Sequence, residues 1–176
     1  MSISDLHLRL REAAVAYTQA GWPILPVETP AAERLICGRS PQDVATAQEW
    51  WTDQAYGIAC YTGKAFDALE MPAQLGDRVR PMLSEHGHPG VIEVPRTGNW
   101  LFLVTPGARR IPDLPAGSGV RLHGKGRWIL LPPTPVAGGC VAWICRPNGG
   151  LPHSMTAQWA ARRALVIARG GPRRVS

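Results

Sequence analysis

The sequence predicts an α+β fold in which helices pack against a mainly antiparallel or mixed sheet within a single domain. The 176 residues suffice for one core, and 45% of them are hydrophobic whereas only 18% are charged. Nineteen glycines and 17 prolines indicate many turns and short elements, which argues against a helical bundle. The order of periodic segments, with helices near both ends and mostly strands between them, supports the same class.

The individual elements rest on periodic segments bounded by glycine and proline. In order, we expect a helix at Asp5–Ala20, a strand at Trp22–Val27, a helix opened by Ser40-Pro41-Gln42-Asp43, strands at Tyr56–Tyr61 and Ala65–Met71, a helix begun by Pro72, a hairpin of Val91–Val94 with Trp100–Val104, a strand at Cys140–Cys145 and a helix at Ser154–Arg169. The helices carry apolar residues at three- and four-residue spacing, whereas the strands are short apolar runs.

Capping and breaker residues set the expected helix ends. Gly21 ends the first helix, and Ser40 followed by proline predicts the N-cap of the second. Gly87 and Gly90 are expected to end the third helix. On the last helix, the residues expected to face the core are Met155, Trp159, Leu165 and Val166.

The segment Gly119–Pro135, GVRLHGKGRWILLPPTP, predicts a second hairpin before the last strand. Val120 and Leu122 lie on its first strand, and Trp128–Leu131 form the returning strand. The glycines between them supply the positive φ that a tight turn requires. Pro132-Pro133 cannot donate to a ladder, so the second strand is expected to end there.

Charge and cysteine content restrict the class of protein. The net charge of +6 favours polyanionic partners such as nucleic acid, and part of it lies in a basic tail, residues 170–176, after an expected domain at residues 1–169. No apolar run approaches the length of a membrane span and the N-terminal segment is charged, so we expect a cytoplasmic protein without membrane contact. The four cysteines are expected to be thiols, because their spacing fits no disulfide framework.

Several conspicuous residues have structural interpretations. Trp22 and the pair Trp50-Trp51 are expected to pack in the core rather than stack on bases. His86 and His88 straddle a helix end without a third ligand nearby, which argues against a metal site. Cys140 and Cys145 are an odd number of residues apart on an expected strand and face opposite ways, which argues against zinc.

Five blocks follow one another along the chain: AAVAYTQAGWPILPV, SPQDVATAQEWW, YGIACYTGKAFDALEMPA, PRTGNWLFLV and GVRLHGKGRWILLPPTP. Together they resemble the bifunctional DNA primase/polymerase domain of the archaeo-eukaryotic primase superfamily, over residues 10–146. The resemblance implies a primase-polymerase-like fold and nucleotide transfer in which acidic side chains hold two divalent ions against a triphosphate.

The resemblance also implies where the site lies. The acid-x-acid pair of the family falls on Glu70 and Pro72, its histidine on Trp100, and its acid in the last block on Arg121. One glutamate opposite an arginine cannot hold Mg²⁺ or Mn²⁺, so we expect no cofactor and no catalytic residue. Glu70 would be a metal ligand only in the alternative of an active enzyme.

Four other acidic residues could in principle replace the lost ligands. Asp67 lies three residues from Glu70 and is expected on the opposite face of the strand. The facing of Glu93 is left open by the sequence. Asp77 and Asp113 are expected to be surface carboxylates.

Positive charge stands where the family has negative charge. A patch that binds phosphate or nucleic acid is therefore expected at Arg96, Arg121, Lys125 and Arg127. The alternative is a solvated, charged hairpin. His123 has no evident orienting partner and is expected to face solvent at the turn, whereas Trp100 is expected to fill the vacated pocket.

Three functional hypotheses remain. The first is a catalytically inactive primase/polymerase-like domain that binds single-stranded DNA, a nucleotide or a protein partner. The second is an active nucleotidyltransferase with an altered metal site. The third is a structural or regulatory interaction module, such as a homodimer. A fold of this kind does not establish its activity, because function belongs to the site.

Overall fold

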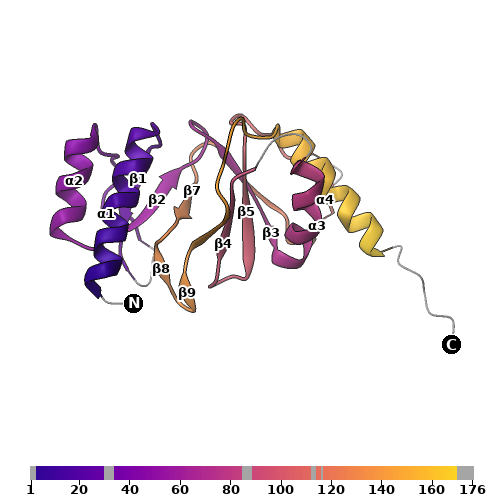
Figure 1. Ribbon diagram of the computed structural model, residues 1–176. Coiled ribbons are helices and arrows are strands. Elements are labelled where there is room, and N and C mark those ends of the chain that lie inside the picture. The colour runs from indigo at the N-terminus through magenta and orange to yellow at the C-terminus, as the bar shows by residue number, and fades with distance from the viewer. Residues whose placement is uncertain (1–2, 30–33, 85–88, 112–113, 116, 170–176) are drawn as a thin grey trace.

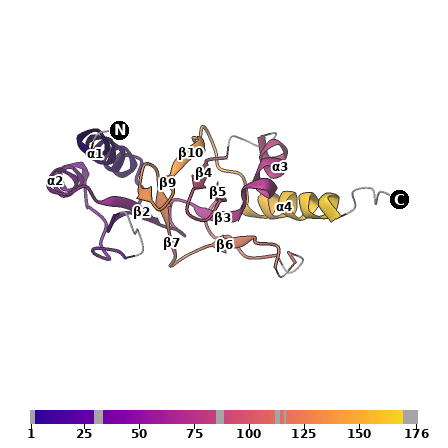
Figure 2. The same cartoon turned by 90° about the horizontal axis from the view of Figure 1, so that it is seen from below.

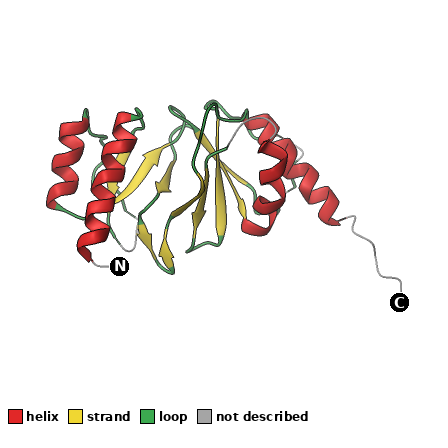
Figure 3. Ribbon diagram, in the orientation of Figure 1, coloured by secondary structure: helices red, strands yellow, loops and turns green. Residues whose placement is uncertain are grey.

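The computed structural model describes residues 3–29, 34–84, 89–111, 114–115 and 117–169, and it confirms the α+β class. Figure 1 shows two pairs of helices on opposite sides of the strands. The first pair is α1 (Ile3–Gln19) with α2 (Val44–Asp53), and the second is α3 (Ala73–Ser84) with α4 (Ser154–Arg169). The same division into outer helices and inner strands is clear in Figure 3.

The strands form two main antiparallel sheets. The three-stranded sheet has the order β1-β2-β7, with β1 at Ile24–Val27, β2 at Gly57–Tyr61 and β7 at Trp128–Leu131. The five-stranded sheet has the order β10-β4-β5-β3-β6, with β10 at Ala142–Cys145, β4 at Val91–Val94, β5 at Asn99–Val104, β3 at Asp67–Pro72 and β6 at Arg121–His123. A short ribbon pairs β8 (Pro135–Val136) with β9 (Gly139–Cys140).

Two hydrophobic cores hold these layers together. One joins α1 and α2 to the three-stranded sheet and to one face of the five-stranded sheet, and it includes the buried Leu10, Trp51 and Leu101. The other lies between the opposite face of the five-stranded sheet and α3 and α4, and it includes Phe102 and Ala161. The five-stranded sheet is therefore covered on both faces, and only its edges and ends can present polar side chains to solvent.

The predicted hairpin of Val91–Val94 with Trp100–Val104 is confirmed by the pairing of β4 with β5. The second predicted hairpin is wrong. β6 pairs with β3 in the five-stranded sheet, whereas β7 pairs with β2 in the other sheet. The glycine turn thus carries the chain from one sheet to the next, and Figure 2 shows β6 and β7 diverging from it.

The connection from β2 to β3 also passes from one sheet to the other, and it lies beside this turn. The Thr62 amide donates to the Arg127 carbonyl at 3.0 Å, and the Thr62 hydroxyl donates to the Gly124 carbonyl at 2.6 Å. Gly63 has a φ of +95°, and a Cβ there would lie 2.4 Å from the Cα of Lys125. Only glycine allows the two connections to approach so closely.

Two expectations about the helices are wrong. Asp43, not Ser40, caps α2, because its carboxylate accepts from the Thr46 amide at 2.8 Å. The inner face of α4 consists of small residues and one amide rather than large apolar side chains, since the buried positions include Ala157, Gln158, Ala161 and Ala164. Three of the residues expected to face inward are instead exposed, namely Met155, Trp159 and Val166.

The remaining boundaries differ by a few residues. Pro72 is the last residue of β3 instead of the first of α3. The expected strand at Cys140–Cys145 divides at Val141 into β9 and β10. Gly87, His86, His88 and the tail at 170–176 lie outside the described residues. None of the helices within the described residues combines the length and apolar character needed to cross a bilayer.

Candidate functional site

The central strand β3 positions the matched acid. β5 pairs with β3 on one side and β6 pairs with it on the other. Because side chains alternate along a strand and paired residues share a face, Glu70 shares its face with two cross-strand partners, Leu101 and Arg121. Asn99 and His123 lie on this face as well, since Asn99 pairs with Pro72 and His123 pairs with Ala68.

Glu70 is almost buried and both of its carboxylate oxygens are hydrogen-bonded. Oε1 accepts from Asn99 Nδ2 at 2.6 Å, and Oε2 lies 2.7 Å from His123 Nε2. The Glu70 side chain is 12% exposed and that of His123 is 25% exposed. The bond to His123 is the main cause of the lowered pKa of Glu70; it outweighs desolvation and is reinforced by Asn99 and by the charge of Arg121.

His123 is not the solvent-facing turn residue that the sequence suggests. It is the last residue of β6, and its ring is held against Glu70. An imidazole oriented by a carboxylate has one nitrogen committed to that carboxylate and the other available to a second partner. The sequence signal for this contact is weak, because it depends on the register of β6 against β3.

Trp100 lies on the opposite face of the sheet from Glu70. Its cross-strand partners are Met71 and Glu93, and a Cβ on Gly76 of α3 would lie 2.8 Å from its ring. The indole nitrogen of Trp100 is buried and has no hydrogen-bond partner among the described residues. The side chain therefore packs between β5 and α3 and does not fill a pocket at Glu70, where Asn99 is the neighbour that makes contact.

The other acidic residues lie away from Glu70. Asp67 is fully buried on the opposite face, as predicted, and its Oδ2 accepts from the Ala108 amide at 2.7 Å. Glu93 lies on the face of Trp100, its cross-strand partner. The Asp77 side chain is 70% exposed and lies 3.9 Å from Arg80, whereas Asp113 falls outside the described residues.

These positions do not fit a two-metal centre. No group of three or more acidic, histidine or cysteine side chains within the described ranges could hold a metal ion. Divalent ions of the magnesium type need several carboxylate or other oxygen ligands. Glu70 is the one acid on its face at the matched positions, and both of its oxygens already have donors.

The basic residues of the expected patch divide into two groups. Lys125 and Arg127 lie on the turn after β6, beside the crossing from β2 to β3 that carries the exposed Lys64. Arg121 is exposed and precedes them on β6. Arg96 belongs to the β4–β5 turn, which adjoins the Pro72 end of β3, whereas the Lys125 turn adjoins its start.

Arg96 is thus separated from Lys125 and Arg127 by the length of β3, whereas Arg121 lies between the two ends, opposite Glu70. Lys64 is the additional cation that sequence reasoning missed, because the contact between the two turns is formed only by the sheet crossings. The cations that the structure brings together near the start of β3 are Lys64, Lys125 and Arg127. Arg121 lies between this group and the other end of β3, paired with Glu70.

Trp51 of α2 lies in the core, and Trp50 and Trp22, which precedes β1, pack against it, as predicted. Trp51 is fully buried and donates its indole hydrogen to the Tyr56 carbonyl at 2.9 Å. Trp22 stacks on Tyr17 with a centroid separation of 5.1 Å. All four cysteines are free thiols in the structure, and Cys60 is fully buried.

Comparison with known proteins agrees with this architecture. A search of curated proteins returned no match. The family model described as "Bifunctional DNA primase/polymerase, N-terminal" matches residues 14–159, a range that begins within α1, ends within α4 and contains every strand. The chain therefore belongs to the Prim-Pol family.

Proposed function

We propose that this Prim-Pol domain binds single-stranded nucleic acid through its basic turns and carries out no nucleotidyl transfer. The observation that carries the proposal is the state of Glu70, whose two oxygens are taken by Asn99 and His123 while Arg121 lies opposite on the next strand. A divalent ion at this carboxylate would have to share its oxygens with the Asn99 and His123 hydrogen bonds, would find no second acid beside it at the matched positions, and would face a fixed positive charge.

The binding surface is the row of cations beside the site. Arg121, Lys125 and Arg127 are exposed and lie within one short stretch of backbone, and Lys64 joins them from the neighbouring turn. Guanidinium and ammonium groups pair with phosphate oxygens without a metal. A flexible single strand can follow such a row, and its affinity should then fall steeply with salt.

Binding of a labelled oligo-dT strand, measured by fluorescence anisotropy in EDTA at several salt concentrations, tests the proposal. The variant Arg121→Gln/Lys125→Gln/Arg127→Gln should weaken binding and reduce the slope of log K against log salt by about 2, since each lost phosphate contact on a single strand contributes roughly 0.7. A matched control with the same charge change, Arg78→Gln/Arg80→Gln/Arg163→Gln, alters exposed arginines on α3 and α4.

The control variant should bind as the unmodified protein does. Equal loss in both variants would show general electrostatic attraction to a basic protein, and no binding at low salt would also overturn the proposal. The second part of the proposal, the absence of nucleotidyl transfer, is tested by primer extension with Mg²⁺ and with Mn²⁺. No product is expected, whereas a product that disappears in Glu70→Ala would establish the active alternative.

A further inference from the structure

A hollow of about 580 Å³ lies between α1 and the segment that runs from the end of β7 to just after β10. Arg9 and Tyr17 line it from α1, and Pro132, Pro133, Trp143 and Arg146 line it from the other segment. Its volume lies within the range of small-molecule sites, roughly 300–1,000 Å³. None of its lining residues belongs to the Glu70 site or to the basic turns.

Hydrogen bonds and ring stacking within the protein hold two of the side chains that line this hollow, Tyr17 and Trp143. The Tyr17 hydroxyl donates to the Pro132 carbonyl at 2.8 Å and accepts from Trp143 Nε1 at 3.1 Å. Trp22, which is partly buried against the core, stacks on the Tyr17 ring with an interplanar angle of 4°. A ligand would therefore enter a formed cavity and would not have to order these side chains on binding.

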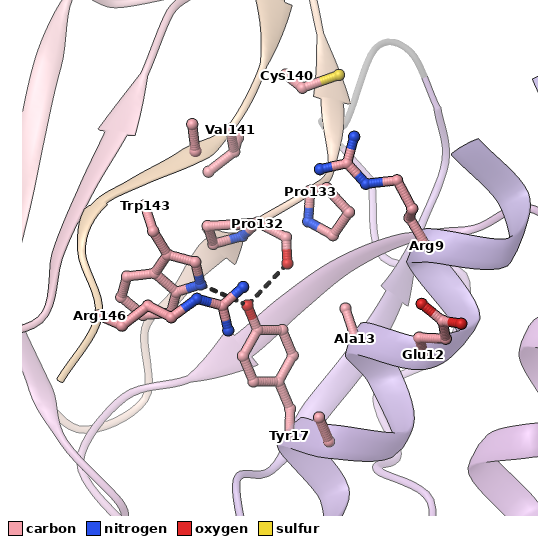
Figure 4. Close-up of a pocket in the computed structure, with 12 residues that line it drawn as sticks. Arg9, Glu12, Ala13, Tyr17, Pro132, Pro133, Cys140, Val141, Trp143 and Arg146 are labelled. Carbon is pink, nitrogen blue, oxygen red and sulfur yellow. Dashed lines mark hydrogen bonds between the residues drawn. The ribbon is translucent and has the colours of Figure 1, made fainter. Parts of the chain in front are cut away.

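The charged groups of the hollow come from two separate elements. Arg9 extends from α1 toward Pro133 and Cys140, and Arg146 lies beside the Tyr17 hydroxyl on the opposite side (Figure 4). Glu12 is the one carboxylate in the lining, so two arginines and one glutamate leave a formal charge of +1. Burial raises the pKa of Tyr17 to about 12, so the phenol adds no negative charge near neutral pH.

We propose that this hollow is a second binding site, for a small organic phosphate that carries a flat ring, such as a free nucleotide. Guanidinium groups match the geometry of phosphate oxygens and need no metal. The indole of Trp143 and the rings of Pro132 and Pro133 provide apolar surface for the flat part of the ligand. The site goes beyond the proposed nucleic-acid surface, which involves other residues.

Calorimetric titration with ATP in EDTA tests the site directly. ATP should bind. The substitutions Arg9→Gln and Arg146→Gln, both at exposed residues, should each weaken binding about tenfold or more, because a hydrogen bond to a charged group contributes roughly 1.5–3 kcal/mol. Inorganic tripolyphosphate should bind more weakly than ATP. Equal binding of the two would overturn the role of the ring, and affinity unchanged in both arginine variants would overturn the site.

Alkylation of Cys140 tests the location of the ligand independently, because Cys140 is one of the residues that line the hollow whereas Cys37 is not. Saturating ATP should slow alkylation of Cys140, measured by mass spectrometry, and leave Cys37 unchanged. Absence of protection at Cys140 under saturating ATP would place the ligand elsewhere and overturn the proposal.

Arg121→Gln should leave ATP affinity unchanged, so failure of this site is distinguishable from failure of the nucleic-acid surface.

Discussion

Replacing Glu70 by glutamine tests whether this carboxylate has a structural role or binds a metal ion. In the structure the carboxylate accepts from Asn99 at 2.6 Å and lies 2.7 Å from His123 Nε2, with only 12% of the side chain exposed. Glutamine retains one acceptor oxygen and presents an amide donor in place of the other. The loss of a charged acceptor toward one or both neighbours should lower the free energy of unfolding by about 1–3 kcal/mol.

For a domain of this length that loss corresponds to a fall in Tm of roughly 2–12 °C at neutral pH. The pKa of Glu70 is lowered in the folded state, chiefly by the hydrogen bond to His123. A lowered carboxyl pKa contributes stability above the pKa of the unfolded chain, and that stability is lost as pH falls through the folded pKa. The difference between the unmodified protein and Glu70→Gln should therefore be full above about pH 5 and shrink toward acid.

Thermal unfolding of both proteins from pH 3 to 8, in EDTA and then with Mn²⁺, measures these effects. A metal ligand predicts a different result. Mn²⁺ should then stabilise the unmodified protein more than the variant. A variant with a higher Tm in EDTA, or selective stabilisation of the unmodified protein by Mn²⁺, would refute the structural role of Glu70.

Two further substitutions test the packing around the site and the hollow. Gly76→Ala should lower the free energy of unfolding by about 1–3 kcal/mol, because its Cβ would lie 2.8 Å from the Trp100 ring; denaturant unfolding measures this, and an unchanged midpoint would show that α3 can move away. Tyr17→Phe should cost about 1–3 kcal/mol, since it removes the donor to the Pro132 carbonyl and leaves the Trp143 indole hydrogen without its acceptor. A loss below about 0.5 kcal/mol in urea unfolding would contradict the second estimate.

Local sequence patterns predict the helices and strands better than they predict which strands pair with one another. The helix at Ser154–Arg169 and the β4–β5 hairpin follow from periodicity and a short turn, and both are confirmed. The hairpin at the glycine turn after β6 was wrong, because turn residues specify a change of direction but not which strand lies alongside. Here β6 and β7 pair with β3 and β2, over separations that no local signal encodes.

The inner face of α4 was mispredicted for a related reason. A large apolar side chain is usually a core residue, but α4 packs closely enough that small residues occupy its buried positions, including Ala157 and Ala161. Trp159 lies on the exposed side, where the Arg162 guanidinium is 4.8 Å from its ring centroid. Helical periodicity alone allows either stripe to face inward, and the space between α3 and α4 decides between them.

The placement of Trp100 shows how a one-residue difference alters the interpretation of the site. Matching the family histidine to Trp100 puts that position on the face opposite Glu70, whereas its predecessor Asn99 contacts the carboxylate. Side chains alternate between faces along a strand, so an offset of one residue in a match moves a functional position across the sheet. The strand register places Asn99 on the face that also carries Glu70 and Arg121.

The residues around Glu70 depend on one another electrostatically. A buried carboxylate without a partner is costly. Asn99, His123 and Arg121 offset that cost through two hydrogen bonds and an opposing charge. An acid in place of Arg121 alone would set two carboxylates opposite each other while Asn99 and His123 still held Glu70. A metal site at Glu70 would therefore require coordinated changes at several positions.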